Sequence, residues 1–153
     1  MYPTLIFIHS WLRWGILILG IVVILKAYIG WIGNKKYLKS DNTLSLFLMA
    51  LFHTQLVFGL LLYLFFSPIT RSAFQDFGAA MKDSQLRYWA VEHSFIMILS
   101  VLIAQFGRIR TKKAHSALNK HRNTAIYFTM ALILIVSRIP WDQATRLFRG
   151  FAE

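Results

Sequence analysis

A carboxylate and an imidazole stand side by side at Glu92 and His93, within a run of mainly apolar residues. His9, Arg13 and His53 lie inside other apolar runs of the chain. Ionisable side chains are costly in hydrocarbon, and those found there usually bind ligands, relay protons or pair with one another. These five residues are therefore the candidate site residues.

The depths of His9 and His93 predict that the two side chains meet. Counted at about 1.5 Å per residue from Thr4 and from Tyr88, both lie roughly 7 to 8 Å below the same membrane surface. The first and third helices of an up-down four-helix bundle are diagonal partners, and bundle cofactor sites are built between facing helices. Neutral imidazole is a common ligand of haem iron. We therefore expect His9 and His93 to be the axial ligands of one haem b per chain.

His53 offers an alternative. Counted from Leu44 it lies about 13 Å deep, near the membrane centre, and the fourth apolar run holds no histidine to pair with it. Helix tilts of about 20° would bring it level with His93, so His53 and His93 are the alternative ligand pair. His115 and His121 precede the fourth run, and we expect both to be solvated residues of a basic loop.

Arg13 and Glu92 allow two interpretations. Arg13 follows His9 by one helical turn on the same face, and Glu92 adjoins His93. The pair could form a buried ion pair that locks the first helix to the third. Alternatively, Arg13 binds a haem propionate or a quinone oxygen, and Glu92 passes protons.

Four apolar runs must position these residues, and each is close to the roughly 20 residues that cross about 30 Å of hydrocarbon. They cover residues 5–25, 44–66, 86–106 and 125–139. None alternates with period two, and an open sheet could not satisfy its backbone in lipid. We therefore predict an all-α fold, an integral membrane four-helix up-down bundle that forms a single domain over residues 1–153.

Two stretches outside these runs carry apolar residues at helical spacing, which predicts short helices lying flat at the membrane surface. One lies between the second and third runs and contains Phe74, Phe77 and Met81. The other follows Pro140 and contains Trp141, Ala144, Phe148 and Phe151.

Composition and charge agree with a membrane protein. Apolar residues make up 57% of the 153 residues, and most of the net charge of +11 gathers in two short connections, residues 34–43 and 107–123. Cytoplasmic membrane loops are enriched in Lys and Arg, so both termini are expected outside. Because the charge follows the loops, nucleic acid is not expected as a partner. The chain has no cysteine, so a haem could not be attached covalently as in c-type cytochromes.

Several motifs carry a resemblance to known proteins: His9-Ser10-Trp11-Leu12-Arg13-Trp14, Phe52-His53-Thr54-Gln55-Leu56-Val57-Phe58-Gly59-Leu60, Glu92-His93 and Ile139-Pro140-Trp141. Over nearly its whole length the chain resembles a family of small bacterial membrane proteins that are often labelled cytochrome b. More distantly, its helices and histidines are similar to those of the bacterial b561 cytochromes.

The resemblance implies a quinol-linked electron carrier in the bacterial inner membrane, holding haem b between helices, with His9, His53 and His93 as candidate ligands. The b561 proteins typically place two ligand pairs in the bundle. The fourth run of this chain contains no histidine, so one haem is expected.

We predict an electron-transfer protein whose partners are the bilayer, quinone and other membrane subunits. Two alternative classes remain open: a cofactor-free accessory subunit of a larger membrane complex, and a small proton-coupled transporter that uses Glu92 and His53. The sequence contains no phosphate loop, dinucleotide glycine motif, zinc-protease motif or serine-nucleophile motif, so hydrolytic catalysis is not expected.

Overall fold

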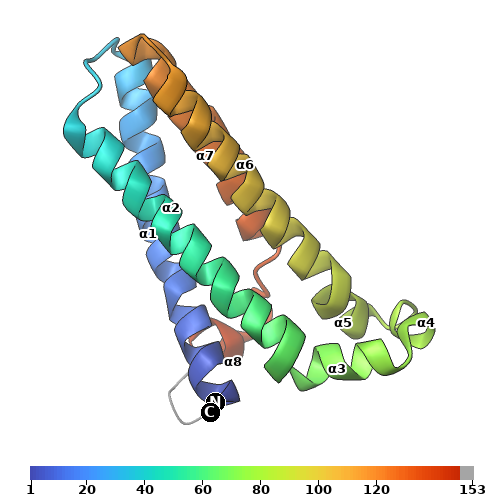
Figure 1. Cartoon of the computed structure of the whole chain (residues 1–153). Coiled ribbons are helices and arrows are strands. Elements are labelled where there is room, and N and C mark those ends of the chain that lie inside the picture. Colours follow the sequence, from blue (N-terminus) through green and yellow to red (C-terminus); the bar gives the residue numbers. More distant parts are fainter. Residues whose placement is uncertain (149–153) are drawn as a thin grey trace.

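The chain folds into four long helices and several short ones (Figure 1), as a computed structural model of residues 1–148 shows. The long helices are α1 (Tyr2–Ile32), α2 (Lys39–Leu61), α6 (His93–Lys113) and α7 (Ala117–Ser137). The short helices are α3 (Pro68–Gln75), α4 (Phe77–Ala80), α5 (Ser84–Arg87) and α8 (Ala144–Leu147), and two π-helical turns, η1 (Leu62–Phe66) and η2 (Tyr88–Glu92), extend α2 and precede α6. Residues 1–148 contain no strand, so the all-α prediction is confirmed for them.

Local sequence signals set several of the helix ends. The Asp41 carboxylate accepts the Leu38 backbone N–H at 2.9 Å at the start of α2, and the Ser116 hydroxyl accepts the Asn119 N–H at 3.2 Å at the start of α7. Each contact satisfies a backbone donor that the first helical turn leaves free. Pro68 opens α3 directly after η1, where its missing N–H costs nothing.

The long helices pack so that α1 and α6 lie diagonally across the bundle, because each of them contacts α2 and α7. This confirms the predicted relation between the first and third helices. The buried core lies midway along the bundle, where the rings of Phe52 and Phe128 stack 6.2 Å apart. The termini of the described chain, the short helices and the π-helical turns all gather at one end (Figure 1).

Three helical segments are long and apolar enough to cross a membrane: residues 2–32, 39–66 and 84–113. Only 22 to 33% of their most apolar windows is buried inside the protein, so most of that apolar surface faces outwards. A soluble domain does not expose apolar surface on this scale, whereas lipid covers it. Three of the four predicted spans are therefore long and apolar enough to cross a membrane.

The fourth predicted span, residues 125–139, differs from the structure. Its helix α7 begins eight residues earlier, at Ala117, and includes Lys120 and Arg122 in its first two turns. It packs closely against α1 and α6, yet it is not one of the helices that meet the length and hydropathy requirements for a span. The short helices α3, α4 and α8 fall on the two predicted amphipathic stretches, and Phe151 lies outside the described residues.

Candidate functional site

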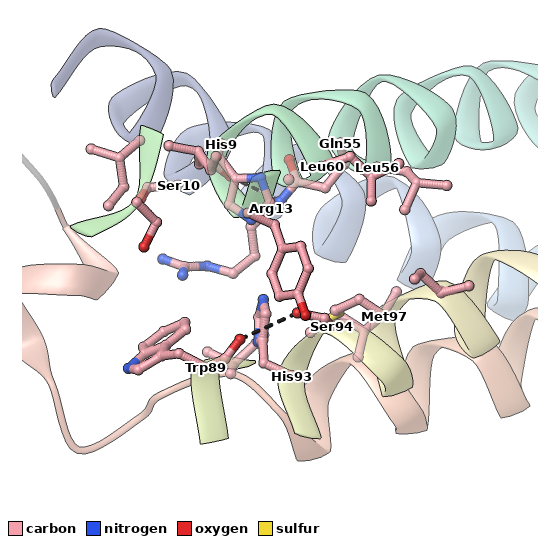
Figure 2. A pocket seen from close by; sticks show the side chains of 18 of the residues that line it. His9, Ser10, Arg13, Gln55, Leu56, Leu60, Trp89, His93, Ser94 and Met97 are labelled. Atoms are coloured by element: carbon pink, nitrogen blue, oxygen red, sulfur yellow. Dashed lines mark hydrogen bonds between the residues drawn. The ribbon is translucent and has the colours of Figure 1, made fainter. Parts of the chain in front are cut away.

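A cavity of about 170 Å³ lies in the half of the bundle that carries the short helices. At about 10 to 15 Å³ per molecule it has room for roughly a dozen waters, so it can hold more than isolated solvent. His9, Arg13 and His93 all line it. Figure 2 shows His9 and Arg13 projecting from α1 on one side, and Trp89 and His93 facing them from the other. We call this space the His9–His93 cavity.

One ring nitrogen of His93 is fixed by the backbone. Its Nδ1 lies 3.0 Å from the carbonyl oxygen of Arg138, at the end of α7. A carbonyl can only accept, so Nδ1 carries the proton and donates, which leaves the lone pair on Nε2. The hydroxyl of Tyr88 donates to the same oxygen at 2.7 Å. A histidine held through one nitrogen and free at the other is the arrangement that metal-binding histidines commonly have.

The π-helical turn η2 sets the direction from which His93 enters the cavity. The His93 N–H bonds to the carbonyl of Tyr88, five residues back, as a π turn requires. Two side chains donate hydrogen bonds to other carbonyl groups of this turn. The Ser94 hydroxyl donates to the Trp89 carbonyl at 3.2 Å (Figure 2), and the hydroxyl of Tyr63 in η1 donates to the Ala90 carbonyl at 2.7 Å. Single π turns occur frequently at functional sites.

His9 approaches the cavity from α1 and is supported by α2. The Gln55 side-chain amide donates to the His9 carbonyl at 2.9 Å, a hydrogen bond that joins α2 to α1. Gly59 lies so close to the ring that a Cβ atom there would stand 3.1 Å from His9 Cε1. His9 Nδ1 and Gln55 Oε1 are buried without a hydrogen-bond partner. Buried polar atoms are normally paired, so these two atoms mark a place where a ligand or water completes the site.

The structure does not pair Arg13 with Glu92, which was one of the two interpretations of these residues. The Arg13 guanidinium instead donates to backbone carbonyls of α8, to Leu147 at 2.8 Å and to Arg146 at 3.2 Å. Trp14 Nε1 donates to the same Leu147 oxygen at 2.9 Å. Arg13 therefore holds α8 over the cavity, although its Nε is buried without a partner.

Glu92 points away from the cavity, which it does not line. Its carboxylate lies 3.0 Å from the guanidinium of Arg87 and 3.7 Å from that of Arg138. Adjacent helical residues point about 100° apart. Because His93 faces the interior, Glu92 meets the arginines at the surface instead of Arg13.

His53 is not part of the cavity. It is exposed on the outer face of α2, although its neighbour Phe52 is almost fully buried. The position of His53 in its apolar run predicts its depth in a membrane, but it does not predict the direction in which its side chain points around the helix. A rotation of about 100° from Phe52 turns it outwards, so the structure does not bring the alternative pair His53 and His93 together.

His121 overturns a second expectation. It is 2% exposed, although we expected a solvated loop residue; His115, by contrast, is exposed. Its ring packs against Gly30, where any side chain would collide with it. The rings of Tyr37 and His121 meet edge-on, with their centroids 4.9 Å apart. The glycine in α1 thus makes room for the imidazole at the end of the bundle opposite the His9–His93 cavity.

Several cavity residues could not be singled out from the sequence. Arg146 of α8 lines the cavity, and its guanidinium carbon lies 4.5 Å from the centre of the Trp89 ring, a cation–π arrangement. Tyr63 lines it from η1. An arginine beyond the spans and a tyrosine near a span end are common at membrane interfaces, so these residue types do not by themselves indicate a place in the cavity.

No protein-family model matches the chain, and neither the curated proteins nor the solved structures include a match. Residues 1–148 hold no group of three or more His, Asp or Glu side chains that could bind a bare metal ion.

Proposed function

We propose that the protein is a membrane electron-transfer protein that binds one b-type haem in the His9–His93 cavity, with His9 and His93 as axial ligands. The observation that carries this proposal is the placement of two histidines, from diagonal helices, on the wall of one cavity. A haem held there would exchange one electron at a time with its partners.

The donor set fits a haem. Two imidazoles suffice as axial ligands, and no cysteine is needed for a b-type group. His93 is oriented by the Arg138 carbonyl, and the buried Nδ1 of His9 has no partner within the described chain. Most of the remaining wall is apolar, with side chains such as Ile16, Leu56 and Met97. An apolar wall excludes water and suits a porphyrin ring.

The charged residues of the cavity suit the two carboxylate groups of a haem. Arg13 and Arg146 line it, whereas no Asp or Glu within residues 1–148 does. Guanidinium groups pair strongly with carboxylates such as haem propionates. Arg13 would hold one of them while continuing to bind α8.

We further propose that the protein spans the bacterial inner membrane four times, with both termini outside, and that its electron donor is membrane quinol. The apolar outer surface of three long helices supports a membrane location. Lys and Arg concentrate at the end of the bundle opposite the cavity, as the positive-inside rule requires for the cytoplasmic end. The cavity would then lie near the outer surface.

The test is to purify the protein in mild detergent from cells supplied with haem and to record reduced-minus-oxidised absorption spectra. We expect a b-type spectrum and about one haem per chain by pyridine extraction. His9→Ala and His93→Ala should each lower the haem content or replace the six-coordinate low-spin spectrum by a high-spin one with a shifted Soret band, because a single imidazole remains to hold the iron.

His53→Ala is the matched control, since His53 lies in a span but outside the cavity, and its spectrum should equal that of the unaltered protein. Equal spectra for all three variants would refute the ligand assignment. A folded but colourless protein would refute haem binding and favour the cofactor-free accessory subunit.

A further inference from the structure

Two exposed side chains line the His9–His93 cavity and indicate where it opens. Among the lining residues of the described chain, Leu60 and Ile98 are the most exposed, at 37% and 39%. Leu60 belongs to α2 and Ile98 to α6, and these two helices contact each other less than the other neighbouring pairs of long helices. The opening therefore lies in the seam between α2 and α6.

The helix α8 covers part of the cavity at the end where the short helices gather. Arg13 and Trp14 bind the backbone of α8, and the ring of Phe148 stacks on Trp14 with centroids 5.2 Å apart. Pro140, which precedes α8, is buried and lines the cavity.

The wall behind the opening is suited to a molecule with hydroxyl groups. Ser10, Gln55 and Ser94 line the cavity and offer hydrogen-bond donors and acceptors together. The Ser94 hydroxyl and the Gln55 amide nitrogen already donate to backbone carbonyls, but Gln55 Oε1 is buried without a partner. A lipid hydrocarbon chain would leave this oxygen unpaired, whereas a quinol hydroxyl can donate to it.

We propose that a bilayer-dissolved quinol docks at the seam between Leu60 and Ile98, with its ring inside the opening and its isoprenoid tail in the lipid. The choice of a quinol rests on the proposed electron-transfer function, whereas the position of the opening rests on the geometry alone. Leu60 and Ile98 are the residues that determine access.

The probe is an azido-ubiquinone applied in the dark to the protein in lipid nanodiscs, then reduced and photolysed. Mass spectrometry should find the label on peptides that contain Leu60 or Ile98. Leu60→Trp and Ile98→Trp should each lower the labelling about tenfold, equivalent to about 1.4 kcal/mol of binding, because the indole fills the opening. Label confined to α8 or to the basic connections would overturn the proposal.

Val57→Trp and Leu102→Trp are matched controls. Val57 and Leu102 lie one turn from Leu60 and Ile98, are 55% and 59% exposed and do not line the cavity. Their labelling should stay within about twofold of the unaltered protein, and an equal loss in all four variants would overturn the proposal. A colourless protein that is labelled at the seam would refute the haem and retain the docking site; a haem-loaded protein without seam label would refute only the docking site.

Discussion

Arg13 and Glu92, at the end of the bundle that carries the cavity, each contact other partners and not one another. Arg13 binds backbone carbonyls of α8, and Glu92 pairs with Arg87 and Arg138. The first is a half-buried contact that ties distant parts of the chain together, whereas the second lies nearer the surface. Their contributions to stability should therefore differ.

Arg13→Gln should lower the free energy of unfolding by about 2 to 3 kcal/mol, because it removes hydrogen bonds from a charged donor to buried carbonyls. Glu92→Gln should change it by less than about 1 kcal/mol, as is usual for exposed ion pairs. Denaturation in detergent, followed by circular dichroism, measures both.

The double variant Arg13→Gln with Glu92→Gln tests the corrected pairing. Residues without shared partners have additive effects within about 0.3 to 0.5 kcal/mol. A coupling energy well above that range would show that Arg13 and Glu92 interact, which would contradict the contacts seen in the structure.

At the scale of elements, close helix contacts decide how far each histidine reaches into the bundle. Gly59 of α2 leaves the space in which the His9 ring lies. The π-helical turn η2 and its bonds to Tyr63 and Ser94 determine how His93 is presented. The positions of the His9 and His93 side chains thus depend on the backbone of neighbouring elements as well as on their own helices.

Gly59→Ala should disturb the site while the fold persists. The new Cβ would lie 3.1 Å from His9 Cε1, so the ring must shift by a few tenths of an ångström. Alanine also favours the helix by about 1 kcal/mol relative to glycine. We expect a shifted Soret maximum or a lowered haem content, with an unfolding midpoint at or above that of the unaltered protein.

Gly15→Ala in α1 is the control for this prediction. Its added Cβ would meet only Leu51 Cδ1, at an ordinary 4.0 Å. The spectrum should remain unchanged. Identical behaviour of the two alanine variants would show that the contact between Gly59 and His9 does not constrain the site.

At the scale of the whole molecule, the ends of the bundle differ in charge and in shape. One end carries the short helices and the cavity, and the other carries the connection before α7, with His115 exposed. The proposed topology places the first end outside and the second in the cytoplasm.

Single cysteines can test this topology cleanly, because the chain has none of its own. Ala79 of α4 and His115 are both exposed and lie at opposite ends. A membrane-impermeant maleimide applied to intact spheroplasts should label the A79C variant and spare H115C until the membrane is permeabilised. The reverse pattern would invert the proposed orientation.

Sequence periodicity predicted most of the fold because a membrane span needs a long apolar run, and such runs are visible without any knowledge of packing. It placed His9 and His93 on diagonal helices for the same reason. It could not place His53, because depth along a helix does not determine the direction around it. The burial of His121 and the bonds of Arg13 depend on contacts between distant segments, Gly30 and α8, which no local pattern records.

The bond between Arg13 and α8 also has a consequence for biosynthesis. Its acceptor carbonyls belong to residues 133 and 134 positions further along the chain. At about 5 to 20 residues per second, the ribosome needs roughly 7 to 27 s to make them after Arg13 has emerged. During that interval the Arg13 guanidinium cannot make these hydrogen bonds. Because Leu147 follows Arg146, the last cavity-lining residue of the described chain, the contact that holds α8 over the cavity forms only after all of these lining residues have been synthesised. Until that contact forms, a molecule that enters the cavity would not have to displace α8.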